Sequence, residues 1–198
     1  MAVSSNRIYL ASRSPRRREL LHQIGVGFEL VIPDVNEAPL PGEAPADYVT
    51  RLSRIKAEVC WMRVIERKLP RLPVLAADTA VVLGRRVLGK PRDRGEAREM
   101  LRLLSGRKHR VLTAVAVAFD DRLALRLSAT TVRFRPLAER EIQHYVATGE
   151  PMDKAGAYAI QGRAAVFVAS ISGSYSGVMG LPLFETAELL ADFGVNVL

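Results

Sequence analysis

The chain has 198 residues, of which 48% are hydrophobic and 25% are charged, and 29 Lys and Arg against 21 Asp and Glu give a formal net charge of +8. This composition excludes an intrinsically disordered chain, and the length fits one domain or at most two joined lobes. The basic residues comprise 24 Arg and 5 Lys. Their charge suits a polyanionic partner and leaves nucleic acid, an acidic membrane surface and a nucleotide open.

Further features of the sequence exclude several classes of protein and of site. No apolar stretch approaches the ~18–20 residues of a membrane-spanning helix. The N-terminus lacks the hydrophobic region, about 7–15 residues long, of a signal peptide. Cys60 is the only cysteine, which excludes an intrachain disulfide and a zinc site built from thiolates. We therefore expect a cytoplasmic protein.

Hydrophobic periodicity predicts strands and helices that alternate along the chain, which is typical of an α/β fold. The first half predicts, in order, a strand at 8–11, a helix from Ser14 and Pro15 to Gly25, a strand at 28–32, a polar loop at 33–45 and an amphipathic helix over 49–62. Lys56 lies beside the apolar stripe of that long helix.

The second half continues the alternation. It predicts, in order, a strand from 74 that ends at Asp78 and Thr79, a further apolar run at 80–83, a helix at 96–104, paired strands at 111–119 and 123–134, and helices at 139–146 and 186–193. Apolar positions change phase between 129 and 132, which predicts a bulge or bend. Residues 149–182 are expected to form loops with short strands.

The first candidate site is the segment SRSPRRR at residues 12–18, where the first strand meets the first helix. A helix N-terminus offers unpaired N–H groups and partial positive charge, so hydroxyls and guanidinium groups there can hold phosphate. A capped, solvated helix start is the alternative explanation.

The second candidate site is centred on Asp78 and Thr79, with Lys90 further along. A carboxylate at the end of an apolar strand lies where open α/β sheets commonly place their ligands, and it can ligate Mg²⁺ or accept a proton from water. Glu37 is a candidate second oxygen ligand. A capping turn for Asp78 and a solvated loop for Glu37 are the alternatives.

The third candidate site is DKAGAY at 153–158, followed by Ile160, Gln161 and Gly162. Glycine permits unusual backbone angles, and the Gln161 amide can read a nucleobase through paired donor and acceptor groups. A turn with a surface Asp–Lys pair is the alternative. Phosphate-loop and dinucleotide fingerprints are absent from the sequence.

Together these stretches resemble the Maf family of nucleoside triphosphate pyrophosphatases. The resemblance runs in order from IYLASRSPRR at 8–17 to GLPL at 180–183. The block DKAGAY with the following IQG is similar to the branch that hydrolyses dTTP and UTP. After Gly162 the chain has RAA where the family commonly has a glycine-rich segment.

The resemblance implies one α/β domain over residues 1–198, with an extended mixed β-sheet flanked by helices and two lobes around a cleft, as in Maf and ITPase-like proteins. It implies a nucleotide diphosphatase that converts dTTP and UTP to the monophosphate and pyrophosphate with Mg²⁺ or Mn²⁺. Modified pyrimidine nucleotides are further candidates. The expected partner is the nucleoside triphosphate, without membrane or nucleic acid, and a homodimer is left open.

The resemblance also assigns roles by position. The catalytic set that it implies is Asp78, Glu37, Lys56 and Lys90, with the metal on Asp78 and Glu37. The substrate-binding set is Ser12, Arg16, Arg17, Thr79 and Gln161. Two alternatives stay open, a pyrophosphatase for 7-methyl-GTP or other modified nucleotides, and a nucleotide- or nucleic-acid-binding regulator of cell division.

Overall fold

The structure is a computed structural model that describes residues 6–197. Residues 1–5, which belong to the N-terminal stretch in which no signal peptide is expected, and residue 198 lie outside the described part. No helix within 6–197 has the length and apolar content needed to cross a membrane.

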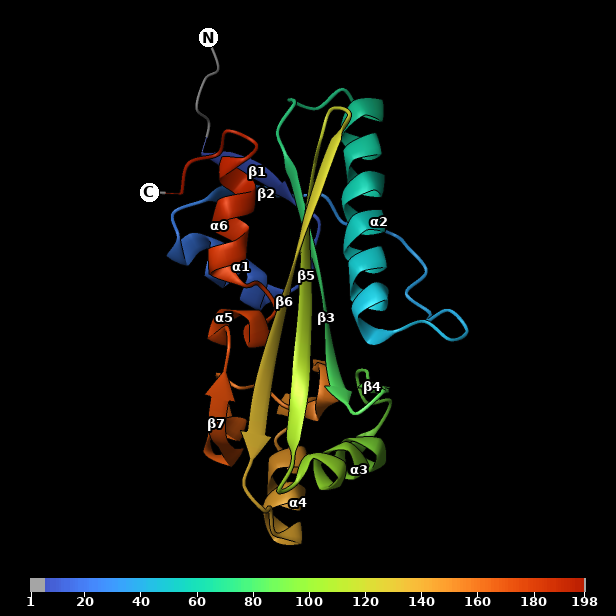
Figure 1. Cartoon of the computed structure of the whole chain (residues 1–198), viewed down its shortest axis with the longest axis vertical. Helices are drawn as coiled ribbons and strands as arrows, with labels where there is room; N and C mark the ends of the chain where they lie inside the picture. Colours follow the sequence, from blue (N-terminus) through green and yellow to red (C-terminus); the bar gives the residue numbers. More distant parts are fainter. Residues whose placement is uncertain (1–5, 198) are drawn as a thin grey trace.

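Within the described residues, seven strands form one mixed sheet in the order β2-β1-β3-β5-β6-β7, with β4 paired to β3 (Figure 1). The strands are β1 (Arg7–Leu10), β2 (Gly27–Leu30), β3 (Val74–Leu83), β4 (Arg86–Leu88), β5 (Lys108–Phe119), β6 (Arg122–Phe134) and β7 (Val168–Ser172). β1 is parallel to β2 and β3, and the other pairs are antiparallel. The expected extended mixed sheet is confirmed.

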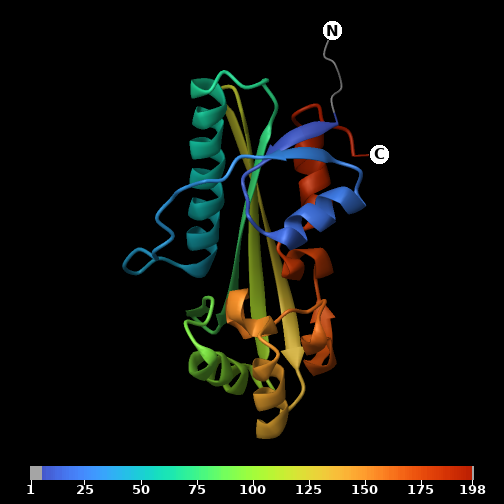
Figure 2. The ribbon, with the colours of Figure 1, turned by 180° about the vertical axis from the view of Figure 1, so that it is seen from behind.

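Helices cover the sheet differently at its two ends. They are α1 (Pro15–Gln23), α2 (Pro45–Glu66), α3 (Arg94–Leu104), α4 (Glu139–Ala147), α5 (Tyr175–Met179) and α6 (Leu183–Ala191). At one end α2 covers one face while α1 and α6 cover the other, and α3 and α4 pack at the far end of the long strands (Figures 1 and 2). The segment 149–182 is more helical than expected, since it contains three 3-10 helices and α5 besides β7.

Separate cores stabilise the two lobes, and the long strands β3, β5 and β6 run through both. In the first lobe, Leu10 and Leu21 pack on the α1 and α6 side of the sheet, and Trp61 packs on the α2 side. In the second lobe, Leu101 and Phe134 belong to a cluster built from α3, α4 and the 3-10 helices. Each buried side chain of this size contributes roughly 1.5–3 kcal/mol, so the long strands are anchored at both ends.

The prediction that a strand ends at Asp78 and Thr79 is wrong, because β3 continues to Leu83. Parallel pairing of β3 with β1 stops at Leu10 and Leu75, whereas pairing with β5 continues to Val82. Asp78 therefore lies in mid-strand, just beyond the carboxyl end of β1. The ligand-binding edge that an open sheet offers is preserved here by the end of the neighbouring strand.

The predicted bulge between 129 and 132 is also wrong with respect to β5, since the β5–β6 pairing runs without a shift. β6 has a register shift only at its end, against β7 at Arg133 and Phe134. The change of phase reflects which face of the sheet is covered. Leu123 and Leu125 pack on the α2 side, whereas Val132 and Phe134, at alternate positions, face the second lobe.

Candidate active site

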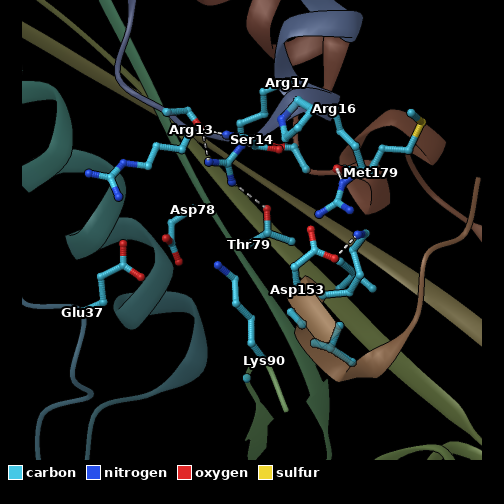
Figure 3. A pocket seen from close by; sticks show the side chains of 18 of the residues that line it. Arg13, Ser14, Arg16, Arg17, Glu37, Asp78, Thr79, Lys90, Asp153 and Met179 are labelled. Carbon is cyan, nitrogen blue, oxygen red and sulfur yellow. Dashed lines mark hydrogen bonds and ion pairs between the residues drawn. The ribbon is translucent and has the colours of Figure 1, made fainter. Parts of the chain in front are cut away.

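A cleft of about 790 Å³ lies between the lobes and is lined by residues of both. Every residue assigned to the site from the sequence lines it, namely Ser12, Arg16, Arg17, Glu37, Lys56, Asp78, Thr79, Lys90 and Gln161. Figure 3 shows most of these side chains converging from different elements. Residues separated by nearly 150 positions in the chain thus share one cavity.

Arg17 is fixed at the start of α1 by all parts of its guanidinium group. Nε donates to the carbonyl of Gly180 (2.8 Å), Nη1 to Ser12 Oγ (3.1 Å) and Nη2 to Thr79 Oγ1 (3.3 Å). Burial lowers the pKa of Arg17, and the charge of Asp78 opposes that effect. The result is a rigid positive charge beneath the cleft.

The start of α1 is shaped as an anion site. Ser14 occupies the N-cap position, as predicted, with Pro15 at the first turn, but its side chain makes no capping hydrogen bond. Its backbone N–H donates instead to Ser12 Oγ (3.1 Å). Since the first-turn amides of a helix lack intrahelical partners, the remaining N–H groups are available to a phosphate.

Thr79 connects this region to α5. Its Oγ1 lies 3.0 Å from Thr113 Oγ1, and the Thr113 hydroxyl donates to the carbonyl of Gly177 (2.7 Å). Gly180, which accepts from Arg17, has a φ of +113° that L side chains rarely adopt. The α5–α6 turn is therefore held against β3 and β5 beneath the two arginines.

Lys56 joins the two carboxylates of the site. Its Nζ lies 2.6 Å from Asp78 Oδ1 and 2.7 Å from Glu37 Oε1. Lys56 is 6% exposed, so this side chain, which lies beside the apolar stripe of its helix, is buried. A buried ammonium requires compensating partners, and these two carboxylates provide them.

The pKa values of Asp78 and Glu37 are shifted in opposite directions. Burial raises the pKa of Asp78, and this effect outweighs the lowering by Lys56 and Arg17. Burial also acts to raise the pKa of Glu37, but its hydrogen bond to Lys56 and the charges of Lys56 and Lys90 hold that pKa below its usual value. Asp78 is consequently the stronger proton acceptor of the pair.

The loop that carries Glu37 is tied to α2 along its length. Tyr48 donates to the carbonyl of Glu37 (3.0 Å), and Arg51 Nη2 donates to that of Ala38 (3.2 Å). Nearer the start of the loop, Cys60 Sγ donates to the carbonyl of Val31 (3.0 Å). These anchors place Glu37 against Lys56, although the residue belongs to a polar, proline-rich loop.

The remaining predicted residues approach from the other sides of the cleft. Arg16 Nε donates to the carbonyl of Met179 (3.3 Å), and burial lowers the pKa of Arg16. The amino group of Lys90 points into the cleft near Asp78 in Figure 3. Gln161 is exposed at the rim.

Some residues of the candidate segments line the cleft although the sequence assigns them no individual role. Arg13 follows Ser12 in the first candidate segment, and Lys154 belongs to the third, for which a surface Asp–Lys turn is the alternative. Lys154 does pair with Asp153, but its side chain is only 15% exposed and lines the cleft. Tyr158 is a further wall residue. Gly156 and Gly162 are the available signal, because they permit close packing against Val81 and Glu150 within the second lobe.

The carboxylates of the cleft can hold a divalent cation if substrate phosphates supply the other ligands. Among the described residues, no three His, Cys, Asp or Glu side chains form a ready metal site. Asp78 and Glu37 nevertheless converge on one ammonium at the edge of the cleft. Mg²⁺ is usually held by one or two carboxylates together with substrate phosphates. The residues therefore suit a cation that enters with a phosphate ligand.

A family model described as Maf-like protein matches residues 7–193. The chain belongs to the Maf family. It is 58% identical to a dTTP/UTP pyrophosphatase of Nitrosomonas europaea over 98% of both chains. It is 57% identical to a dTTP/UTP pyrophosphatase of Nitrosospira multiformis, over 100% of this chain and 99% of that one. The Staphylococcus aureus Ham1 protein matches with a TM-score of 0.45 and 13% identity, over 65% of this chain and 71% of that one.

Proposed function

We propose that this Maf-family protein hydrolyses dTTP and UTP to the nucleoside monophosphate and pyrophosphate. The observation that carries the proposal is the cleft in which the Asp78–Lys56–Glu37 link faces the arginine-rich start of α1. Nearly full-length relatives named dTTP/UTP pyrophosphatase, at 57% and 58% identity, support the choice of substrate.

The triphosphate lies between the two lobes. The amides at the start of α1 and the side chain of Arg16 hold phosphate oxygens, while Arg17 supplies fixed positive charge behind them. Lys90 reaches the phosphates from the opposite wall. Because hydrogen bonds hold Arg16 and Arg17 in place before substrate binds, these two cations stabilise the charge that develops on the departing pyrophosphate without reorganising.

Hydrolysis requires a water molecule aligned with the α-phosphorus and the bridging oxygen of the leaving group. Asp78 accepts the proton of that water, a role to which its burial-raised pKa is suited. Lys56 orients the Asp78 carboxylate. Asp78 and Glu37 are also the residues that would hold Mg²⁺ or Mn²⁺, which neutralises phosphate charge when bound.

Gln161 selects the base. Its exposed amide stands at the rim of the cleft, and within residues 6–197 it makes no hydrogen bond of its own. One carbonyl and one NH₂ group can pair with the edge of a pyrimidine. A base without the matching acceptor and donor makes fewer hydrogen bonds to this amide, which favours the pyrimidine whose edge fits it.

The test is a panel of nucleoside triphosphates, including dTTP, UTP, CTP, GTP and 7-methyl-GTP, each offered with Mg²⁺ or Mn²⁺ while released pyrophosphate is measured. We expect dTTP and UTP to be preferred. Preference for 7-methyl-GTP would transfer the protein to the alternative substrate class. Release of pyrophosphate from none of them would reject the enzymatic function.

A further inference from the structure

Tyr145 and Glu150 form a hydrogen-bonded pair outside the main cleft and anchor the backbone segment that carries Gln161. The Tyr145 hydroxyl donates to Glu150 Oε1 (2.9 Å) and accepts from the backbone N–H of Ala159 (3.1 Å). The other oxygen of Glu150 accepts from the N–H of Arg163 (3.2 Å). The two anchored amides lie two positions before and two positions after Gln161.

The packing of Gly162 provides a third point of attachment. A Cβ atom at this position would lie 2.4 Å from Glu150 Oε1 and 2.6 Å from its carboxyl carbon. The Glu150 carboxylate therefore rests directly against the backbone of the residue that follows Gln161. The segment 159–163 is held by side chains on both of its flanks.

Tyr145 is itself rigid. It is 4% exposed, and its ring packs edge-on against Phe167 with centroids 5.3 Å apart. Glu150 is partly buried and borders, with Gln161 and Gly162, a smaller hollow next to the main cleft. Neither Tyr145 nor Glu150 lines the main cleft, so any effect they have on a nucleotide there acts through the segment they hold.

We infer that Tyr145 and Glu150 are positioning residues that fix the backbone of 159–163, so that the Gln161 amide faces the nucleobase, and thereby set the preference for pyrimidines. This inference rests on the proposed function. Because the amide of Gln161 has no side-chain anchor among the described residues, its direction depends on the backbone beneath it. Small displacements of a positioning group are costly, and a shift of about 1 Å can cost up to about a hundredfold in rate.

Two conservative variants separate positioning from packing. Tyr145→Phe removes both hydroxyl hydrogen bonds and keeps the ring against Phe167. Glu150→Gln keeps the size of the side chain but turns one acceptor into a donor. Glu139→Gln is the matched control, since it breaks the exposed ion pair with Arg102 in the same lobe, away from the cleft. Circular dichroism and thermal unfolding confirm which variants fold.

The experiment measures kcat and KM for UTP and GTP in these variants, in Gln161→Ala and in the double variant Tyr145→Phe/Gln161→Ala. We expect Tyr145→Phe to raise the KM for UTP and lower the UTP-over-GTP preference, each by about tenfold, with kcat nearly unchanged. In the Gln161→Ala background the same change should have no further effect on preference. Glu139→Gln should leave preference unchanged.

Full preference in both Tyr145→Phe and Glu150→Gln, or an undiminished loss in the Gln161→Ala background, would overturn the inference. Amide hydrogen exchange provides a readout that does not depend on activity, and faster exchange at Ala159 and Arg163 is expected in Tyr145→Phe. A wild-type protein that hydrolyses no triphosphate would reject the proposed function. Unchanged exchange at both amides would reject the positioning role whether or not the protein is active.

Discussion

The buried histidine on β5 makes the stability of this protein depend on pH in a way that one substitution should remove. His109 is 2% exposed, its Nε2 lies 2.8 Å from the Tyr158 hydroxyl, and Phe134 packs edge-on against its ring. Within the described residues its Nδ1 has no hydrogen-bond partner. Burial lowers the pKa of His109 to about 4, from 6.5.

The sign of the effect follows from proton binding. Between pH 6.5 and about 4 the unfolded chain binds a proton at His109 that the folded chain does not, so stability is lost as pH falls through that range. At about 1.4 kcal/mol for each pH unit, the full loss is about 3 kcal/mol. About 2 kcal/mol of it should appear between pH 7.5 and pH 5.

The assay is urea unfolding of wild type and His109→Gln at pH 7.5 and pH 5, in buffers of equal ionic strength. The carboxyl groups of the two proteins are the same and contribute equally to the pH dependence, so the difference between the two isolates His109. His144→Gln, at an exposed position of α4, controls for the substitution itself. We expect His109→Gln to lose about 2 kcal/mol less than wild type on acidification. Equal losses in the two proteins would show that His109 is not the source of this pH dependence.

Three further predictions concern Asp78, Arg17 and Gly156. Asp78→Asn should keep the fold, since Lys56 retains Glu37 as a partner, and should lower kcat about 10²–10⁴-fold; near-normal turnover would move the proton acceptor elsewhere. Arg17→Lys cannot reproduce three separate hydrogen bonds and should raise the KM for UTP about tenfold, so an unchanged KM would contradict its role. Gly156 has a φ of +69°, and a Cβ atom at this position would lie 2.8 Å from the side chain of Val81. Gly156→Ala should therefore lower the free energy of unfolding, measured in urea, by at least about 2 kcal/mol. A neutral effect would show that the backbone relaxes.

Part of the candidate site was predictable because its residues occupy places that local chemistry makes recognisable, whereas the role of Lys56 was implied only by the resemblance to the Maf family. The segment 12–18 begins a helix after a strand, and Asp78 interrupts an apolar strand. Both patterns are local, and the pairing of β1 with β3 then brings them together. The alternation of strands and helices likewise follows from periodicity that any short window contains.

Other features depend on partners distant in the sequence. Nothing near Lys56 shows that Glu37 and Asp78 will bury it, and nothing near Asp78 shows that β5 will extend the strand to Leu83. The change of phase of the apolar positions in β6 predicts a local bulge, because periodicity alone does not show which lobe covers which face of the strand. The packing of the Glu150 carboxylate against Gly162 is likewise visible only in three dimensions.

The central claim, that Asp78 directs water to the α-phosphorus, is tested most directly by hydrolysing UTP in water labelled with oxygen-18 and analysing the products by mass spectrometry. We expect wild type to form UMP and pyrophosphate with the label in UMP alone, and Asp78→Asn to form neither at a comparable rate. Label in pyrophosphate, or release of orthophosphate with UDP, would contradict it.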